Sequence, residues 1–316
     1  MNLSRKRALA TIAAGISLAP RAVRSQALVT LRVGGPPVEA GLPLFYAHRA
    51  GLFERAGIKL ELSKGSNGAA AAAAVAGGAL DVGLSSMLAI ILGHARGVPL
   101  TIVAPSGLTI LGSPGGLVVL NSSPLSTAKD FNGKTIAAAA VNDVNSLGMW
   151  CWMDQNGGDS STVKVVEIPQ AAQPTALEQG RVDGITVSNQ AFTLAMSTGK
   201  MRLVTNVWNA IAPRILLVCW FSTTGWVERN RSVAERFGKV IAEAATYCNG
   251  HVAETVDDLV TLSGLDRSLV TQMKRNFQTP TVKAAEIQPM IDGAVKYKLL
   301  AKSFPAREII AETAQT

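Results

Sequence analysis

Six short stretches rich in Ser, Asn, Gln and Gly stand where predicted strands end and helices begin, and they are the best candidates for chemistry in this sequence. A helix start presents free backbone N–H groups and a partial positive charge, so such stretches can hold an anion without a cationic side chain. Ser and Asn are also common helix caps, so capping alone remains an alternative for each stretch. The stretches are residues 35–41, 63–68, 85–87, 141–146, 169–173 and 188–190.

Twelve residues of these stretches are predicted to contact a ligand. Four polar side chains carry most of the prediction, two from each half of the pattern: Asn67, Ser86, Asn142 and Ser188. Glu39 and Asp143 complicate a purely anionic ligand, because an acid that faced the site would require an amine or another donor on the ligand. The remaining predicted residues are Pro37, Gly41, Ser66, Met87, Gln170 and Asn189.

Short signatures of enzymes are absent from the sequence. It contains no G-x-x-x-x-G-K-[ST], G-x-G-x-x-G, G-x-S-x-G or H-E-x-x-H, and its three histidines stand far apart. Three scattered cysteines, Cys151, Cys219 and Cys248, favour buried thiols over a disulfide framework or a metal site. We therefore predict a protein that is not an enzyme, with no catalytic residue, no metal and no cofactor.

One eight-residue pattern occurs twice, ending at Asp81 and at Asp183. It begins with Ala and then Val or Leu, followed by two positions that take any residue and by Gly. One further variable position, Leu or Val, and Asp complete it. In each copy a glycine ends a helix and an aspartate precedes the next strand. Both aspartates stand at the start of a strand, whereas ligands gather at the carboxyl ends of parallel strands. We therefore predict structural roles for both.

Short apolar runs alternate with helical runs, and this alternation indicates an α/β fold with parallel sheets, laid down twice. The expected organisation is a signal peptide over residues 1–27, a discontinuous lobe 1 over residues 28–120 and 209–316, and lobe 2 over residues 121–208. Residues 115–123 and 214–222 are strand-like and are expected to cross between the lobes as a two-strand hinge. The region from residue 226 onward reads as helical.

The first 27 residues read as an export signal. They have a basic start, an apolar run over residues 8–19 that is too short to span a bilayer, and small residues at Ser25 and Ala27. "SRKRAL" is a weak match to a twin-arginine signal, so the export route stays open. Five basic residues of the formal charge of +8 fall in this segment, and the charge of the remainder does not indicate nucleic acid. We expect a periplasmic protein, cleaved near Ala27.

Several longer motifs resemble one known family. "GLPLFYAHRAGLFERAGIKLEL", "GSNGAAAAAAVAGGALDVGLSS" and "ARGVPLTIVAP" are similar to the substrate-binding proteins of ABC importers for nitrate, sulfonate and taurine, a group that includes thiamine-pyrimidine binders. "STAKDFNGKTIAAAA" is similar to the start of that family's second lobe, "ALEQGRVDGITVSNQAF" to its later helix–strand junction, and "MIDGAVKYKLLAKSFPAREII" to its C-terminal helix. The likeness covers nearly all of the chain after the signal.

The resemblance implies a type II periplasmic-binding-protein-like fold, with two α/β lobes and a two-strand hinge. It implies capture of a small-molecule ligand, a sulfonate, nitrate or carboxylate type of anion, and delivery to an ABC permease and its ATPase by a monomer. The stretch "GGPPVEAG" is Pro-rich and acidic, unlike the small polar version in sulfonate binders. A thiamine-pyrimidine binder, an enzyme on the same fold and a periplasmic sensor therefore stay open as alternatives.

Export is testable on the protein that the native host secretes. Its intact mass should correspond to a chain that begins near Leu28, because the small residues at Ser25 and Ala27 suit a signal peptidase. Recovery of the full-length chain from the cytoplasm would contradict the prediction.

Overall fold

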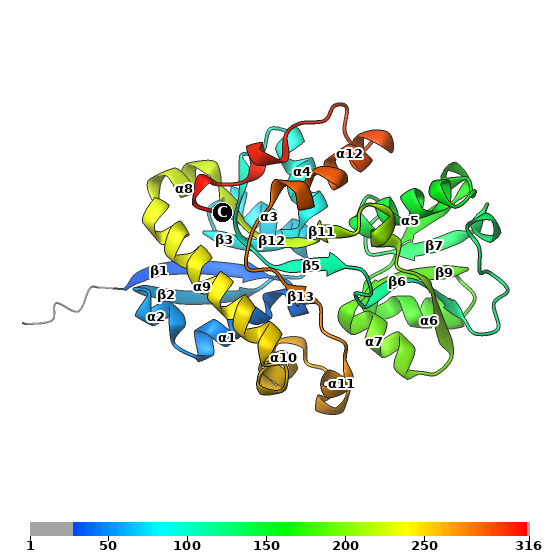
Figure 1. Ribbon diagram of the computed structural model, residues 1–316, viewed down its shortest axis with the longest axis horizontal. Coiled ribbons are helices and arrows are strands. Elements are labelled where there is room, and N and C mark those ends of the chain that lie inside the picture. The colour runs from blue at the N-terminus through cyan, green and yellow to red at the C-terminus, as the bar shows by residue number, and fades with distance from the viewer. Residues whose placement is uncertain (1–27, 315–316) are drawn as a thin grey trace, which may run out of the picture.

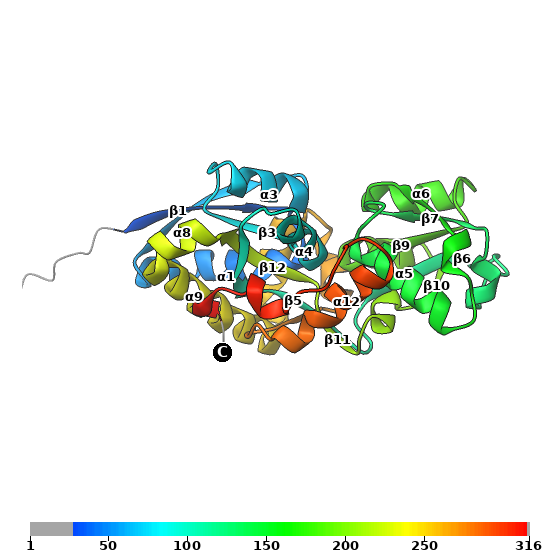
Figure 2. The same cartoon turned by 90° about the horizontal axis from the view of Figure 1, so that it is seen from above.

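The structure, a computed structural model, describes residues 28–314, and two α/β parts lie side by side in it (Figures 1 and 2). The predicted signal peptide, residues 1–27, lies outside the described residues. Each part is built on a five-stranded sheet, and a three-stranded sheet connects them. This architecture agrees with the predicted α/β class. The assignment of whole segments to lobes remains a prediction, refined below strand by strand.

The first sheet has the strand order β2-β1-β3-β12-β4. β1 runs parallel to β2 and β3, whereas β12 runs antiparallel to β3 and β4. Alternation explains β1, in which Leu31 and Val33 are buried and their neighbour Arg32 is half-buried. The strands are β1 (Val29–Gly35), β2 (Ile58–Lys64), β3 (Val82–Ser86), β4 (Leu100–Pro105) and β12 (Val218–Thr223).

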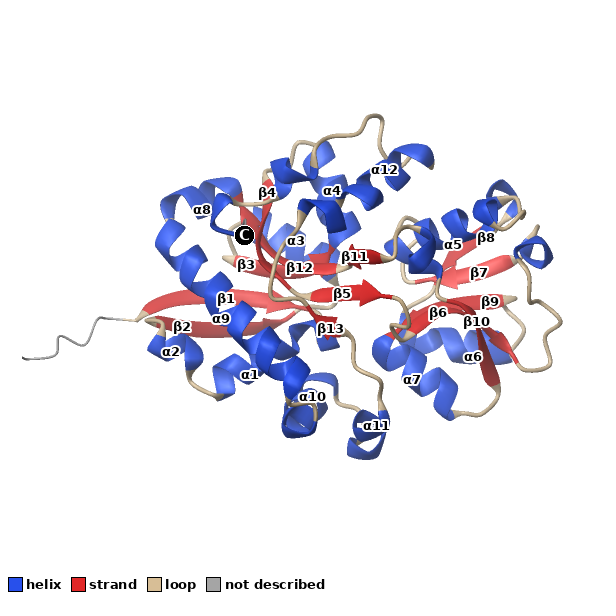
Figure 3. Ribbon diagram, in the orientation of Figure 1, coloured by secondary structure: helices blue, strands red, loops and turns tan. Residues whose placement is uncertain are grey.

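Helices cover both faces of this sheet, with α3 on one face and α1 and α9 on the other (Figures 2 and 3). The long α9 buries a stripe that recurs every three or four residues, including Val233, Phe237, Ile241 and Ala244, which is the spacing of one helix face. The helices are α1 (Leu42–Arg49), α2 (Leu52–Arg55), α3 (Gly68–Ala76), α4 (Met87–Ala95), α8 (Thr224–Arg229), α9 (Arg231–Gly250), α10 (Val256–Ser263), α11 (Arg267–Gln272) and α12 (Gln288–Lys296).

The second sheet repeats the first in the order β10-β6-β9-β7-β8. β7 lies parallel to β8 and β9, and the antiparallel β6 stands beside β9 as β12 stands beside β3. The strands are β6 (Gly115–Leu120), β7 (Thr135–Ala138), β8 (Lys164–Glu167), β9 (Gly184–Ser188) and β10 (Met201–Thr205), and the helices are α5 (Val144–Gln155), α6 (Gln173–Glu178) and α7 (Asn189–Ser197). Short 3-10 helices are η1 (Glu39–Gly41), η2 (Ala128–Phe131), η3 (Ser160–Thr162), η4 (Gln170–Ala172), η5 (Val207–Ala210), η6 (Ala253–Thr255), η7 (Ala284–Glu286), η8 (Ala306–Ile309) and η9 (Glu312–Ala314).

The strands that cross between the two sheets are not the ones that the sequence predicted. β5 (Gly107–Ile110) pairs antiparallel with β11 (Arg214–Leu216), and β13 (Phe277–Gln278) lies on the other side of β5. Residues 115–120 were expected to end lobe 1 and to cross, but as β6 they pair with β9 and β10 inside the second sheet. Residues 214–222 were predicted to cross as one strand, but they form two. β11 pairs with β5 at the crossing, and β12 pairs with strands of the first sheet.

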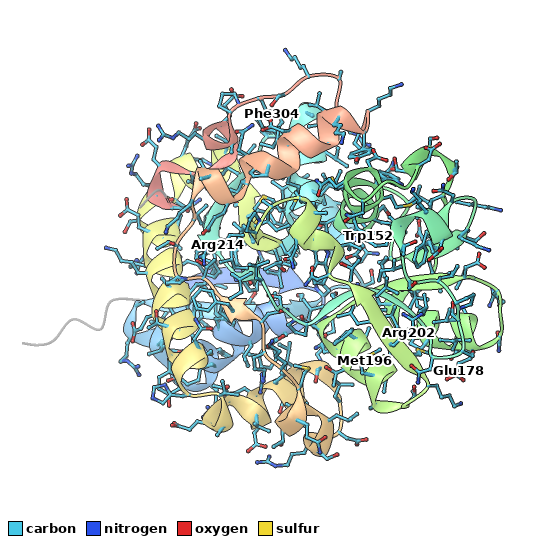
Figure 4. All side chains as sticks on the ribbon, turned by 45° about the vertical axis from the view of Figure 1, so that its right-hand side comes forward. Trp152, Glu178, Met196, Arg202, Arg214 and Phe304 are labelled. Carbon is cyan, nitrogen blue, oxygen red and sulfur yellow. The ribbon has the colours of Figure 1, made fainter. Side chains whose placement is uncertain are left out.

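The hinge strand β11 is tied to the C-terminal region by Arg214, which is labelled in Figure 4. Its Nε and Nη2 atoms each donate to Glu286 Oε1 over 3.1 Å, and the Glu286 side chain is nearly buried. A further contact joins α5 of the second part to the residue that follows α12, because Tyr297 Oη donates to Asp154 Oδ2 over 2.9 Å. The two parts are therefore held on the hinge side by backbone pairing and by side chains.

One apolar core runs through the first part and the hinge into one face of the second sheet. Leu117 and Val119 of β6 belong to this core, while Val118 between them belongs to a separate cluster on the opposite face. This alternation is that of a strand buried on both faces. All three cysteines are buried and free, as the sequence predicted.

The repeated pattern has the same structural role in both parts. The backbone N–H of Asp81 donates to Arg32 O, and the Asp81 carboxylate accepts from the Arg32 N–H, both over 2.8 Å. Asp183 makes the same pair of bonds with Thr135, again over 2.8 Å. Gly78 and Gly180, which end the preceding helices, have φ of 74° and 69°, in the left-handed region that favours glycine. The predicted structural roles of both aspartates are confirmed.

Replacing these aspartates by alanine should lower stability unequally. Asp81 also accepts two hydrogen bonds from the Arg32 guanidinium, whereas Asp183 is exposed. We expect Asp81→Ala to lower the free energy of unfolding by about 2 kcal/mol and Asp183→Ala by about 1 kcal/mol in urea titrations. A greater loss in Asp183→Ala than in Asp81→Ala would contradict this assignment.

Candidate functional site

All six predicted stretches lie at the carboxyl ends of parallel strands, three in each sheet. β1, β2 and β3 lead into η1, α3 and α4, and β7, β8 and β9 lead into α5, η4 and α7. Ligands of open α/β sheets bind outside these strand ends, so the position of the stretches suits a binding site. Contact of the twelve residues with a ligand remains a prediction.

Three of the predicted side chains cap their own helices. Asn67 Oδ1 accepts from Ala70 N over 2.8 Å at α3, and Ser86 Oγ accepts from Ala89 N over a long 3.4 Å at α4. Asp143 Oδ1 accepts from Ser146 N over 2.8 Å at α5. The capping alternative is therefore realised at these positions. The caps occupy the backbone N–H groups of Ala70, Ala89 and Ser146, and at the start of α4 the N–H of Met87 donates to Leu217 O over 2.8 Å.

The other predicted residues divide into exposed, buried and paired ones. Ser188 donates from its Oγ to Gln170 Oε1 over 3.2 Å, which ties two strand-exit stretches of the second part together. The Met87 side chain is fully buried in the core, and its contact with a ligand stays a prediction. Gly41 is buried in η1, and Pro37, Ser66 and Asn142 are exposed.

Glu39 lies at a contact between the two parts. It is 1% exposed, and its Oε2 accepts from Asn189 Nδ2 of α7 over 2.5 Å. Its Oε1 accepts from the backbone N–H of Asn276 over 3.1 Å, and Asn276 Nδ2 donates to Asn189 Oδ1. We call Glu39, Asn189 and Asn276 the interlobe triad. Asn189 has φ of 45°, a left-handed conformation that asparagine tolerates better than most residues.

Burial raises the pKa of Glu39 from 4.5 to about 7. The positive charge of Arg275 and the hydrogen bonds from Asn276 and Asn189 oppose the shift without cancelling it. The pKa of Asp143 is also raised by burial, against the hydrogen bonds from Ser146. Of the two acids that the sequence singled out, Glu39 is therefore the one placed between the parts, and Asp143 serves as a cap.

A cavity of about 470 Å³ opens beside Glu39. Arg275 lines it, and sequence patterns do not single out this residue because it follows α11 in the region that was expected to be helical. The only available signal was the short run "NFQT" after "MKR", which interrupts the helical pattern and forms β13. The lining residues are Glu39, Leu42, Ile110, Leu111, Gly112, Ser113, Cys248, Asn249, Val252, Lys274, Arg275, Asn276, Phe277 and Gln278.

Residues 28–314 contain no group of three or more His, Cys, Asp or Glu side chains arranged to hold a metal ion. In the same part of the chain, no helix has both the length and the apolar character required to cross a bilayer.

Comparison with known families gives the affiliation of the chain. A family model described as NMT1/THI5 like matches residues 40–255, more than half of the sequence. The chain belongs to the NMT1/THI5-like family. A curated relative in Schizosaccharomyces pombe, a 4-amino-5-hydroxymethyl-2-methylpyrimidine phosphate synthase, is 33% identical over 96 residues. That match covers 30% of this chain and 27% of the relative, so the chain spans about a quarter of the length of the curated protein it matches.

Solved structures agree on the fold of this family member. The periplasmic aliphatic sulphonate binding protein SsuA from Escherichia coli superposes with a TM-score of 0.75 at 18% identity, covering 91% of this chain and 93% of that chain. The alkanesulfonate-binding protein SsuA from Xanthomonas axonopodis pv. citri, bound to MOPS, superposes with a TM-score of 0.74 at 18% identity, covering 90% and 98%. The predicted periplasmic-binding-protein-like fold and the predicted family resemblance are confirmed.

Glu39 should make stability depend on pH. Its folded pKa is raised, so between pH 4.5 and about 7 the folded chain keeps a proton that the unfolded chain has released. The free energy of unfolding should therefore fall as pH rises through this window, by up to about 3 kcal/mol. Urea titrations near pH 5 and pH 8 measure this fall, and Glu39→Gln should reduce it.

The exposed Glu228 supplies the matched control. Glu228→Gln should keep the pH dependence of the unaltered protein. Equal pH dependence in Glu39→Gln and in the unaltered protein would overturn the assignment of the shift to Glu39.

Proposed function

We propose that this protein is an extracytoplasmic solute-binding protein that captures a small organic or inorganic anion between its two lobes. The ligand head group would be a sulfonate, nitrate or carboxylate. The protein would act as a monomer and deliver the ligand to an ABC permease and its ATPase in the membrane. Residues 28–105 and 218–314 would form lobe 1 and residues 115–205 lobe 2, with the hinge between them.

One observation carries the proposal: the 2.5 Å hydrogen bond between Asn189 Nδ2 and Glu39 Oε2 joins the strand-exit ends of the two sheets. A second bridge runs beside it, from Gln190 Nε2 to Pro37 O over 3.4 Å. The helix starts of α3, α4, α5 and α7 belong to the same strand ends. A ligand held there would stabilise the closed arrangement by binding it more tightly than the open one.

The anion class rests on the chemistry of these helix starts. An anion at a helix N-terminus gains roughly 0.3–1 kcal/mol when exposed and up to about 2 kcal/mol when partly buried. Several such starts with good hydrogen bonds can supply the roughly 8 kcal/mol of micromolar binding. The two SsuA proteins, whose fold this chain shares, are sulfonate-binding proteins, one of them bound to MOPS.

A second candidate is a thiamine-pyrimidine type of ligand. Glu39 is a buried acceptor whose pKa is raised to about 7, and a pyrimidine with an exocyclic amine would offer it a donor. The 33% identical stretch of the yeast synthase supports the same chemistry, and with it an enzyme on this fold. Turnover would separate the enzyme from the binder, because a binder returns its ligand unchanged.

Calorimetry on the ligand-free mature protein decides between the candidates. We expect ethanesulfonate, nitrate or a small carboxylate to bind and an aminopyrimidine not to bind. The double variant Ser86→Ala with Asn142→Ala should weaken anion binding by roughly tenfold or more. X-ray scattering should record smaller closure on ligand addition in that variant.

Ser268→Ala serves as the control, because Ser268 is exposed on α11. It should leave binding unchanged. Binding of the aminopyrimidine alone, abolished by Glu39→Gln, would overturn the anion proposal in favour of the second candidate. Steady conversion of the ligand would favour the enzyme.

A further inference from the structure

Two consecutive residues at the start of α7 reach from the second part to the segment that follows β1. Asn189 Nδ2 donates to Glu39 Oε2 over 2.5 Å, and Gln190 Nε2 donates to Pro37 O over 3.4 Å. Pro37 and Glu39 follow β1 of the first sheet, whereas Asn189 and Gln190 follow β9 of the second. Bonds between protein groups therefore join the strand-exit edges of the two sheets directly.

The first part presents Glu39 and Asn276 as a pair. Glu39 Oε1 accepts from Asn276 N over 3.1 Å. Asn276 directly precedes β13, which pairs with β5, and Gln278 of β13 exchanges two hydrogen bonds with Asn249 of α9. The position of Asn276 is thus set by the first part and the hinge, and not by α7.

The amide of Asn189 complements this pair because an amide carries both a donor and an acceptor. Its Nδ2 donates to Glu39, and its Oδ1 accepts from Asn276 Nδ2. A carboxylate at position 189 would keep the acceptor for Asn276 but would turn a second acceptor and a negative charge toward Glu39. The contact between the two parts therefore depends on the chemistry of one side chain.

The backbone of Asn189 is also in an uncommon conformation. Its φ of 45° lies in the left-handed region, which non-glycine residues adopt at a cost and which asparagine tolerates better than most. Such a residue persists where its surroundings hold it in place. The bonds from its side chain to Glu39 and Asn276 run to the first part, so the contact between the parts supports this conformation.

α7 moves with the second sheet. Ala195 of α7 is fully buried in the apolar cluster that also contains Val118 of β6 and Val187 of β9. A hinge motion that separates the two sheets would therefore carry the start of α7 away from the first part. It would break the bonds of Asn189 to Glu39 and Asn276 together.

We propose that the interlobe triad is a latch that holds the two lobes together without a ligand, so that opening must precede ligand entry. This rests on the proposed function for the movement of the lobes, and it adds that side chains of the chain itself supply part of the closing free energy. A ligand can enter only those molecules that have opened, so the latch would slow association.

The test measures the distance between the lobes in the mature protein, freed of bound molecules by unfolding and refolding. Spin labels are attached at Ala73→Cys in α3 and Thr175→Cys in α6, two exposed positions on helices that lie on the same side of their sheets (Figure 2). The three native cysteines are buried, which directs the labels to the introduced ones. Pulsed electron double resonance then gives the distribution of label distances.

The unaltered protein should show mainly the short distance of the closed arrangement. Asn189→Asp should lower the ratio of closed to open molecules about tenfold or more, because it removes a buried donor and opposes Glu39 with a carboxylate. Glu39→Gln should also favour the open form, because its new amide faces the amide nitrogen of Asn189. Asn189→Ser tests the same bonds without adding charge, should Asn189→Asp fail to fold.

The double variant Glu39→Gln with Asn189→Asp is the decisive one. It exchanges donor and acceptor between the two positions, so the new amide can donate to the new carboxylate, and it should restore the short distance. The control Gln179→Glu, at an exposed position after α6, adds the same charge to the second lobe and should leave the distribution unchanged.

A long distance in the unaltered protein would overturn the latch. So would equal distributions in the unaltered protein and Asn189→Asp, or a double variant that is as open as the single ones. Calorimetry with ethanesulfonate tests the proposed function separately. Distances that respond to the variants in a protein that binds no anion would refute that function and keep the latch, whereas anion binding with unresponsive distances would refute the latch alone.

Discussion

β5 and β11 pair antiparallel at the crossing between the two main sheets, and the arrangement of the other elements depends on this pairing. Within the described residues, the chain leaves the first sheet after β4 and returns to it at β12, so each sheet receives its antiparallel strand from across the hinge. β12 stands beside β3, and β6 stands beside β9. The strand-exit stretches of the two parts lie near each other because the chain crosses between the sheets through the short paired strands β5 and β11.

The interlobe triad depends on that orientation. Glu39 is buried with Asn189 of α7 and Asn276 against it, and burial is the main cause of its raised pKa. Burial stabilises this carboxylate less than water would, despite two hydrogen bonds and a nearby cation. If the proposed closure is what buries Glu39, closure and proton uptake would favour each other. Under the proposed function, ligand binding, protonation of Glu39 and closure would thus be linked through this side chain.

The two copies of the aspartate pattern illustrate a different constraint. Asp81 binds the backbone of the neighbouring parallel strand at Arg32, and Asp183 binds the backbone of its neighbouring parallel strand at Thr135. These bonds lie at the opposite ends of the strands from the predicted site. The hydrogen bonds of the repeated pattern, which hold the strands together, therefore lie away from the loops that are predicted to bind a ligand.

Local patterns determined the α/β class, most strands and helix starts, the buried cysteines and the roles of Asp81 and Asp183, because periodicity and glycine punctuation act over a few residues. They also indicated Glu39 as an acid of interest. Only the tertiary structure decided that residues 115–120 belong to the second sheet, because strand pairing is a long-range choice. It alone brought Asn276 and Arg275 beside Glu39, since the burial and charge that give these side chains their properties come from segments more than 200 residues apart in sequence.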